Sequence, residues 1–290
     1  MTFRSALVGL LLVAVAPTAA SAQSARGPLA AFDGGQGGWY LRGDLGIASP
    51  LTSGFTQDSV AVNGGAFGGE RLSRTGIAGV GVGWRIDDRF RVDTTWELRS
   101  GSSLDGVSNI TLANARGQTV ADLTSVYTGK VQSQVALVNA YVDIGTWNRF
   151  TPFVGAGVGI ARNTVSDLRG VNLASVAFWS DTAPYGQIGG LTEVSHGVSA
   201  PKTNYSFAWA LMGGVGWAVD DRLTVEASYR YLNLGKTAST SLVACDCGAI
   251  GSPIKVGGLA SHDLRVGARW ALDAKPAPAP AQRLPVVAKY

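Results

Sequence analysis

Charged side chains recur at every second residue in several stretches of this sequence. Arg91, Asp93, Glu97 and Arg99 share one parity within ten residues. The full set with this spacing is Arg42, Asp44, Arg85, Arg91, Asp93, Glu97, Arg99, Asp143, Glu226, Arg230, Asp263, Arg265 and Arg269. Charges removed from water persist when they are paired. The pattern therefore predicts a network of paired charges, with a polar path for ions or small solutes as the alternative.

The elements that carry these charges alternate between polar and apolar residues. In the stretch from Asn204 to Leu232, Phe207, Trp209 and Leu211 share one face, and Asp220-Asp221-Arg222 separates two such runs. A period of two predicts an antiparallel hairpin, and runs of about ten residues suit tilted strands that cross a bilayer. The segment 84–93 recurs as 217–226, which indicates a repeated hairpin.

Short and long connections alternate along the chain. Short turns are expected at 87–89, 145–151 and 220–222, and long irregular loops at 49–74, 100–130, 163–203 and 233–260. This asymmetry is typical of outer-membrane barrels, which have short periplasmic turns and long extracellular loops. We therefore predict an all-β fold, a transmembrane antiparallel up-and-down β-barrel of eight strands. A hairpin hidden at residues 171–178 would give ten.

Aromatic residues collect towards the expected strand ends. Five tryptophans fall in one layer at the periplasmic side: Trp39, Trp84, Trp147, Trp217 and Trp270. Trp96, Trp209, Tyr229 and Tyr231 lie towards the opposite ends. Bilayer interfaces favour such rings, which have an apolar body and a polar edge. These residues predict two aromatic belts.

The chain divides by composition into four parts. Residues 1–22 read as a secretory signal peptide, with Arg4 before an apolar run and a small-residue cleavage site. Residues 23–37 form an N-terminal lead-in, residues 38–270 the barrel, and residues 271–290 a Pro/Ala-rich periplasmic tail. The net charge of +4 and the 15% of charged residues argue against nucleic-acid binding.

The sequence gives little support for a nucleotide, metal or catalytic site. The glycine runs 79–83 and 155–159 lie inside alternating strands and precede no helix, so they predict no nucleotide site. His196 and His262 lack ligand-spaced partners, and nothing selects a nucleophile for a hydrolytic dyad with His196. We expect no enzyme activity, cofactor or metal. Cys245 and Cys247 predict a local disulfide, with free thiols and redox or metal chemistry as alternatives.

Four motifs carry a resemblance to a known family. They are Trp39–Asp44, Asn139–Asp143, Thr151–Gly159 and Ser228–Tyr231. They resemble the OmpA-like eight-stranded porin-family barrels of alphaproteobacterial outer membranes, the opacity-type surface proteins. The resemblance covers about Gly38 to Trp270. It implies a bacterial outer-membrane protein with a structural or surface-interaction role, or alternatively a small-solute channel.

The expected partners follow from this location. They are outer-membrane lipid and lipopolysaccharide, and an extracellular protein or glycan bound through the loops. A further hypothesis is contact between the tail, with Lys275, Arg283 and Lys289, and peptidoglycan.

Overall fold

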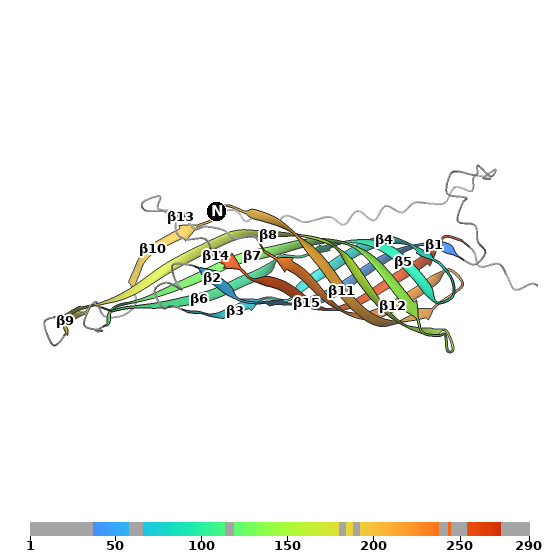
Figure 1. The fold of residues 1–290 in the computed structure, drawn as a ribbon, viewed down its shortest axis with the longest axis horizontal. Helices are drawn as coiled ribbons and strands as arrows, with labels where there is room; N and C mark the ends of the chain where they lie inside the picture. The colour runs from blue at the N-terminus through green and yellow to red at the C-terminus, as the bar shows by residue number, and fades with distance from the viewer. Residues whose placement is uncertain are drawn as a thin grey trace, which may run out of the picture. The chain divides into compact units, whose positions relative to one another are not determined.

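The computed structural model describes residues 37–57, 66–113, 119–179, 184–187, 192–237, 243–244 and 254–273, and these ranges are mostly β-strand (Figure 1). The predicted signal peptide, nearly all of the lead-in, the cysteine pair and the tail after residue 273 lie outside the described residues. No helix in the described ranges is long and apolar enough to cross a membrane.

Eight antiparallel strands close into a ring. In ring order they are β1 (Gly38–Thr52), β4 (Thr75–Arg85), β5 (Phe90–Arg99), β7 (Thr119–Asp143), β8 (Phe150–Trp179), β11 (Lys202–Ala218), β12 (Leu223–Lys236) and β15 (Gly258–Ala271). The pairing of β15 with β1 closes the ring. The predicted eight-stranded barrel is confirmed, and closure leaves the ring without an unpaired edge.

The strand register gives the stagger of the ring. Following directly paired residues once around the ring leads from Ser49 back to Trp39, a shift of ten residues along β1. The path runs through His262, Tyr231, Leu211, Ala156, Ala140, Val92 and Trp84. Strand number, stagger and tilt are linked in a closed barrel, and small barrels have a tilt of about 35–45°.

Two of the short turns are stabilised by the same pair of hydrogen bonds from the backbone to an aspartate. The Asp87 carboxylate accepts hydrogen bonds from the backbone N–H groups of Arg89 and Phe90, each at 2.7 Å. Asp220 does the same with Arg222 and Leu223 at 2.8 Å. These bonds favour the charged carboxylate and lower the pKa of both aspartates. The repeated sequence therefore folds into the same turn twice.

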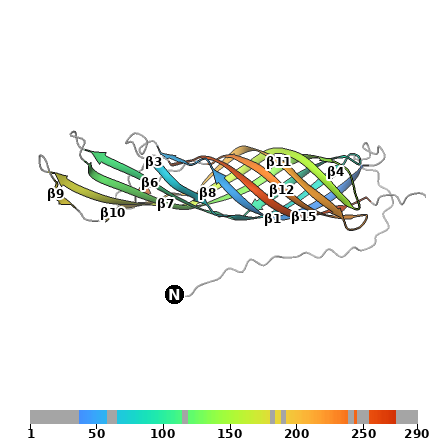
Figure 2. The same ribbon diagram turned by 90° about the horizontal axis from the view of Figure 1, so that it is seen from below.

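The predicted long loops were wrong in one respect, because strands continue into all four. β7 and β8 are 25 and 30 residues long, far more than a membrane crossing requires. They extend past the ring with β6 (Ser102–Ala113) and β10 (Thr192–Val198), as Figure 2 shows. The remaining short strands are β2 (Phe55–Gln57), β3 (Ala66–Leu72), β9 (Pro184–Gln187), β13 (Val243–Ala244) and β14 (Ile254–Val256).

The physical reason for this error is the environment of these strands. Beyond the bilayer the outward face contacts water instead of lipid, so exposed residues such as Asn109, Thr111 and Asp122 are polar. Without an apolar outward face, the period of two is weak. The extra strands add to the extracellular sheet and leave the number of strands in the ring at eight.

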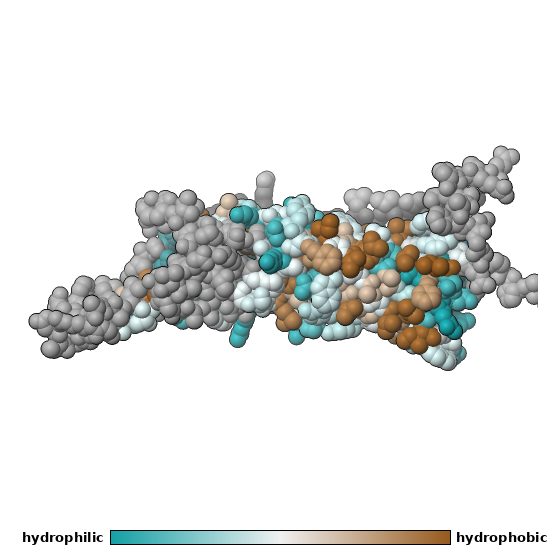
Figure 3. Space-filling view, in the orientation of Figure 1, coloured by the Kyte–Doolittle hydropathy of each residue, from teal (hydrophilic) through white to brown (hydrophobic). Residues whose placement is uncertain are grey.

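The outward face of the ring is apolar, as alternation predicted. Leu45, Ile47, Val158, Leu211 and Leu264 are among the large apolar side chains exposed on it. In Figure 3 hydrophobic residues gather on the side of the molecule where Figure 1 places β4, β5, β11 and β12. A band of this kind is what lipid contact requires.

Candidate functional site

The predicted charges meet in the interior of the barrel. One cluster joins Glu97, Arg99, Arg230 and Asp263, which come from β5, β12 and β15. Arg230 Nη2 donates to both carboxylate oxygens of Glu97 at 2.8 Å, and to Asp263 Oδ2 at 2.7 Å. Arg99 Nε donates to Glu97 Oε1 at 3.0 Å. All four side chains are buried, so each charge depends on the others for stabilisation.

A second cluster surrounds Arg42 of β1. Its guanidinium donates to Asp44 through Nε and Nη2 at 3.0 and 2.8 Å, and to Asp93 Oδ2 through Nη1 at 2.7 Å. The same Nη1 donates to the Tyr141 hydroxyl at 2.7 Å. Asn139 Nδ2 completes the shell of Asp93 at 2.8 Å. This arginine thus holds two carboxylates from different strands.

Glu226 lies among three guanidinium groups. Arg91, Arg269 and Arg42 approach its carboxylate at 3.3, 3.4 and 3.6 Å. Arg91 Nε also lies 3.2 Å from Asp143 Oδ1, and its guanidinium carbon lies 4.1 Å from the centre of the Tyr141 ring. Cation–π contact adds stabilisation to an arginine removed from water.

Arg265 connects the two clusters. Its Nη2 lies 3.3 Å from Asp44 Oδ2 and 3.6 Å from Glu97 Oε2. The interior therefore contains one continuous network of six arginines and six carboxylates. These are twelve of the thirteen predicted residues: Arg42, Asp44, Arg91, Asp93, Glu97, Arg99, Asp143, Glu226, Arg230, Asp263, Arg265 and Arg269. The formal charges of this set cancel.

Arg85 is the exception. It ends β4, is only half-buried, and makes no ion pair with another residue in the described ranges. Its position next to the short turn explains this, because water reaches the side chain there.

Inward-facing glycines leave space that neighbouring side chains fill. A Cβ on Gly83 would collide with the Tyr40 ring, and one on Gly157 would collide with the Asn139 amide. Arg42 and Arg265 also pass close to Gly81 and Gly79, respectively. The glycine face is therefore occupied in the structure by aromatic, amide and guanidinium groups.

An apolar cluster inside the barrel was not predicted. Its members are buried residues from six strands, β6, β7, β8, β11, β12 and β15: Leu104, Tyr127, Val131, Val135, Leu137, Ala161, Val165, Leu168, Ala208, Ala210, Leu232, Leu234 and Leu259. Leu137 and Leu232 have the inward parity of the charged residues, two and six positions from Asn139 and Glu226. This parity was the signal available in the sequence.

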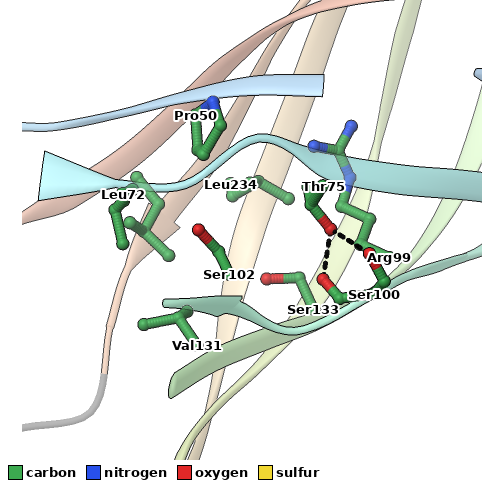
Figure 4. Close-up of a pocket in the computed structure, with 10 residues that line it drawn as sticks. Pro50, Leu72, Thr75, Arg99, Ser100, Ser102, Val131, Ser133 and Leu234 are labelled. Carbon is green, nitrogen blue, oxygen red and sulfur yellow. Dashed lines mark hydrogen bonds between the residues drawn. The ribbon is translucent and has the colours of Figure 1, made fainter. Parts of the chain in front are cut away.

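A small pocket joins the charged and apolar parts of the interior (Figure 4). Arg99 lines it together with Val131, Leu234 and Leu259 of the apolar cluster. It has room for about one water molecule. The pocket is therefore too small for an organic solute.

The predicted tryptophans gather at the end of the ring that carries the short turns. Trp39 and Trp84 are directly paired and their rings lie 5.2 Å apart. Trp217 faces Phe150, Trp270 faces Leu223, and Trp147 lies in the β7–β8 turn with 61% of its surface exposed. At the other end Trp209 and Tyr231 lie 5.5 Å apart.

The remaining candidate residues do not assemble into a site. His196 lies 3.2 Å from Glu193 on β10, and His262 contacts Tyr229 on the outside of the barrel. Among the described residues no group of three or more His, Cys, Asp or Glu is arranged to hold a metal ion. Cys245 and Cys247 lie outside the described residues, so their disulfide stays a prediction.

Sequence comparison assigns the family. The profile of the outer membrane protein beta-barrel domain matches residues 7–245, which is most of the chain. The chain belongs to this family of outer-membrane β-barrels. It is a protein of the bacterial outer membrane, with short periplasmic turns and long extracellular connections.

Individual relatives are distant but cover much of the chain. The outer membrane protein PagN of Salmonella typhimurium is 28% identical over 215 residues, covering 69% of this chain and 76% of PagN. "Putative adhesin RP828" of Rickettsia prowazekii is 24% identical and covers 81% and 87%. Among solved structures, Neisserial surface protein A is 15% identical with a TM-score of 0.39, covering 80% of this chain and 96% of that one.

Proposed function

We propose that this outer-membrane barrel is a scaffold for surface interactions, with a lumen closed by its own side chains. The observation that carries the proposal is the continuous interior network, in which six arginines and six carboxylates cancel in charge. The apolar cluster adds a layer that ions cross only at high cost. A closed lumen leaves the extracellular sheet as the part available to partners.

The extracellular sheet has a surface suited to glycan or protein contacts. On its exposed side Thr111 donates to Asp122 at 2.8 Å, and Thr124 donates to Asn109 at 3.0 Å. Hydroxyl, amide and carboxylate groups in a fixed order on a paired sheet offer preorganised hydrogen bonds. The relative named as an adhesin supports this role. On this proposal the protein acts without catalysis.

Binding of whole cells that display the protein tests the surface role. Cells carrying the wild type are compared on glycan- and protein-coated surfaces with cells carrying Asn109→Ala/Thr124→Ala. The control is Thr146→Ala/Thr151→Ala, which removes another exposed hydroxyl pair, 2.8 Å apart, at the periplasmic turn between β7 and β8. Loss of attachment only in the first variant supports the proposal. Equal attachment by both variants and the wild type on every surface contradicts it.

A small-solute channel is the alternative function. One observation favours it: buried guanidinium nitrogens of Arg91, Arg265 and Arg269 have no hydrogen-bond acceptor among the described residues. Such donors favour a hydrated path through part of the lumen. Planar-bilayer recordings on purified protein separate the two functions. Steady open levels in the wild type that shift on Glu97→Ala or Arg230→Ala would establish the channel and exclude the closed scaffold.

A further inference from the structure

Three exposed cations lie just beyond the lipid-facing band, on its extracellular side. With strands tilted by about 40°, each residue rises about 2.5 Å along the barrel axis, so the ten residues from Trp39 to Ser49 of β1 rise about 25 Å. The apolar band of outer-membrane barrels is also about 25 Å high, so a band that begins at Trp39 ends near Ser49. Following the strand pairings from Trp39 to the other strands, and using the same rise per residue, we find that Arg74, Arg162 and Lys236 lie about 28 Å above Trp39. All three side chains are exposed.

These cations come from different sides of the ring. Arg74 directly precedes β4, and Lys236 ends β12. Arg162 follows Ile160, the last apolar residue that β8 presents to lipid. The three therefore surround the barrel at one level and do not form a single local patch.

Among the residues that the structure describes, no carboxylate neutralises these three cations. Arg74, Arg162 and Lys236 make no ion pair with another residue that the structure describes. The nearest exposed acid on β8, Asp167, lies further from the membrane and is paired with Lys130 at 3.4 Å. At the periplasmic end the exposed turns instead carry an acidic majority: Asp87, Asp88, Asp220, Asp221 and Asp273 against Arg89, Arg149 and Arg222. The two borders of the band thus differ in sign.

Arg162 has the most developed surroundings. On the outward face it is directly paired with Gln134 of β7 and Tyr205 of β11. The next outward pair is Thr164 and Thr203, whose hydroxyl oxygens lie 2.9 Å apart. A guanidinium flanked by amide, phenol and hydroxyl groups suits a phosphate attached to a sugar, because the phosphate takes the charged donors and the sugar takes the neutral ones.

We propose that Arg74, Arg162 and Lys236 bind phosphate groups of lipopolysaccharide in the outer leaflet. The lipid chains then lie against the apolar band and the phosphorylated sugars lie at the level of the three cations. Cations at an anionic membrane surface add favourable electrostatic energy. The site is independent of the proposed surface role, since it follows from the position of the charges relative to the membrane.

Binding of purified lipopolysaccharide to the full-length protein in phosphatidylcholine nanodiscs tests this site. The test variant is Arg74→Gln/Arg162→Gln, and the control is Arg89→Gln/Arg222→Gln, which removes two exposed arginines from the periplasmic turns. We expect the test variant to bind about 25-fold more weakly, at about fivefold for each charge removed, and the control to bind like the wild type. Lys236→Gln alone is expected to weaken binding about fivefold.

Two further ligands identify the chemistry that is recognised. Enzymatically dephosphorylated lipopolysaccharide is expected to bind wild type and test variant equally weakly. With phosphatidylglycerol in the nanodisc, the difference in binding between wild type and test variant is expected to be smaller than with lipopolysaccharide, because this lipid supplies an anionic phosphate but no phosphorylated sugar. Equal lipopolysaccharide binding by wild type and test variant would overturn the proposal. The proposal would also be overturned if the control variant lost as much lipopolysaccharide binding as the test variant, or if phosphatidylglycerol separated wild type and test variant by the same factor as lipopolysaccharide. Heat-modifiable gel mobility verifies that every variant is folded.

Discussion

Arg230 Nη2 lies 2.8 Å from both carboxylate oxygens of Glu97, and these residues occupy equivalent positions in the two copies of the repeated hairpin. They are 133 residues apart, the same separation as Trp84 and Trp217. One copy therefore carries an acid where the other carries an arginine. Inside the closed barrel the two copies neutralise each other.

Removing one member of this pair is expected to be far worse than removing both. Glu97→Met leaves Arg230, Arg99 and Arg265 short of a buried carboxylate, and should lower the free energy of unfolding by about 3–5 kcal/mol. Glu97→Met/Arg230→Met keeps the formal charges balanced and should cost less than either single change. Urea unfolding in lipid vesicles, followed by tryptophan fluorescence, measures both. A double variant less stable than each single one contradicts the pairing.

Gly83 should tolerate alanine poorly. A Cβ there collides with the buried Tyr40 ring, so Gly83→Ala is expected to cost about 1–3 kcal/mol of unfolding free energy. Gly43→Ala is the matched control, because nothing lies within 4 Å of a Cβ at that position of β1. The same vesicle assay compares them. Equal stability of the two variants would mean that Tyr40 does not fill the space over Gly83.

The apolar cluster should contribute both stability and closure. Leu137→Ala and Leu232→Ala remove fully buried side chains, and each is expected to cost about 2–5 kcal/mol. If this layer closes the lumen, the double variant should show more frequent or larger current steps in planar bilayers than the wild type. The exposed Leu211→Ala on the lipid-facing side serves as control. Unchanged currents in the folded double variant would assign closure to the charged network alone.

The turn aspartates predict a pH effect of defined sign. The native state lowers the pKa of Asp87 and Asp220 through backbone hydrogen bonds. Their stabilising contribution is therefore present above about pH 4, the ordinary range of aspartate, and is lost as the pH falls through the lower native pKa. Asp87→Asn/Asp220→Asn should lose less stability on acidification below about pH 4 than the wild type.

The control for this effect uses the neighbouring turn residues. Asp88 and Asp221 are exposed and accept no hydrogen bond from a described residue, so Asp88→Asn/Asp221→Asn should follow the wild-type pH dependence. The readout is the urea midpoint as a function of pH. The prediction is contradicted if Asp88→Asn/Asp221→Asn flattens the pH dependence of the urea midpoint while Asp87→Asn/Asp220→Asn leaves it unchanged.

The alternation of the sequence predicted much of the candidate site. Twelve of the thirteen charged positions are buried in one network because side-chain direction in a strand depends only on parity. Arg85 differs because parity does not indicate how close a residue lies to the rim. The extracellular strands were mistaken for irregular loops because water on their outward face removes the apolar half of the pattern.

The sequence by itself determined the membrane-spanning segments, the face of each strand that meets lipid, and the short turns, since these depend on local hydropathy and on residues such as Asp87 and Asp220. Only the tertiary structure decided which charges meet. Arg230 reaches Glu97, and Arg265 reaches both Asp44 and Glu97, because ring closure with a ten-residue stagger sets their relative heights. Stagger is a property of all eight strands together, so no single segment encodes it.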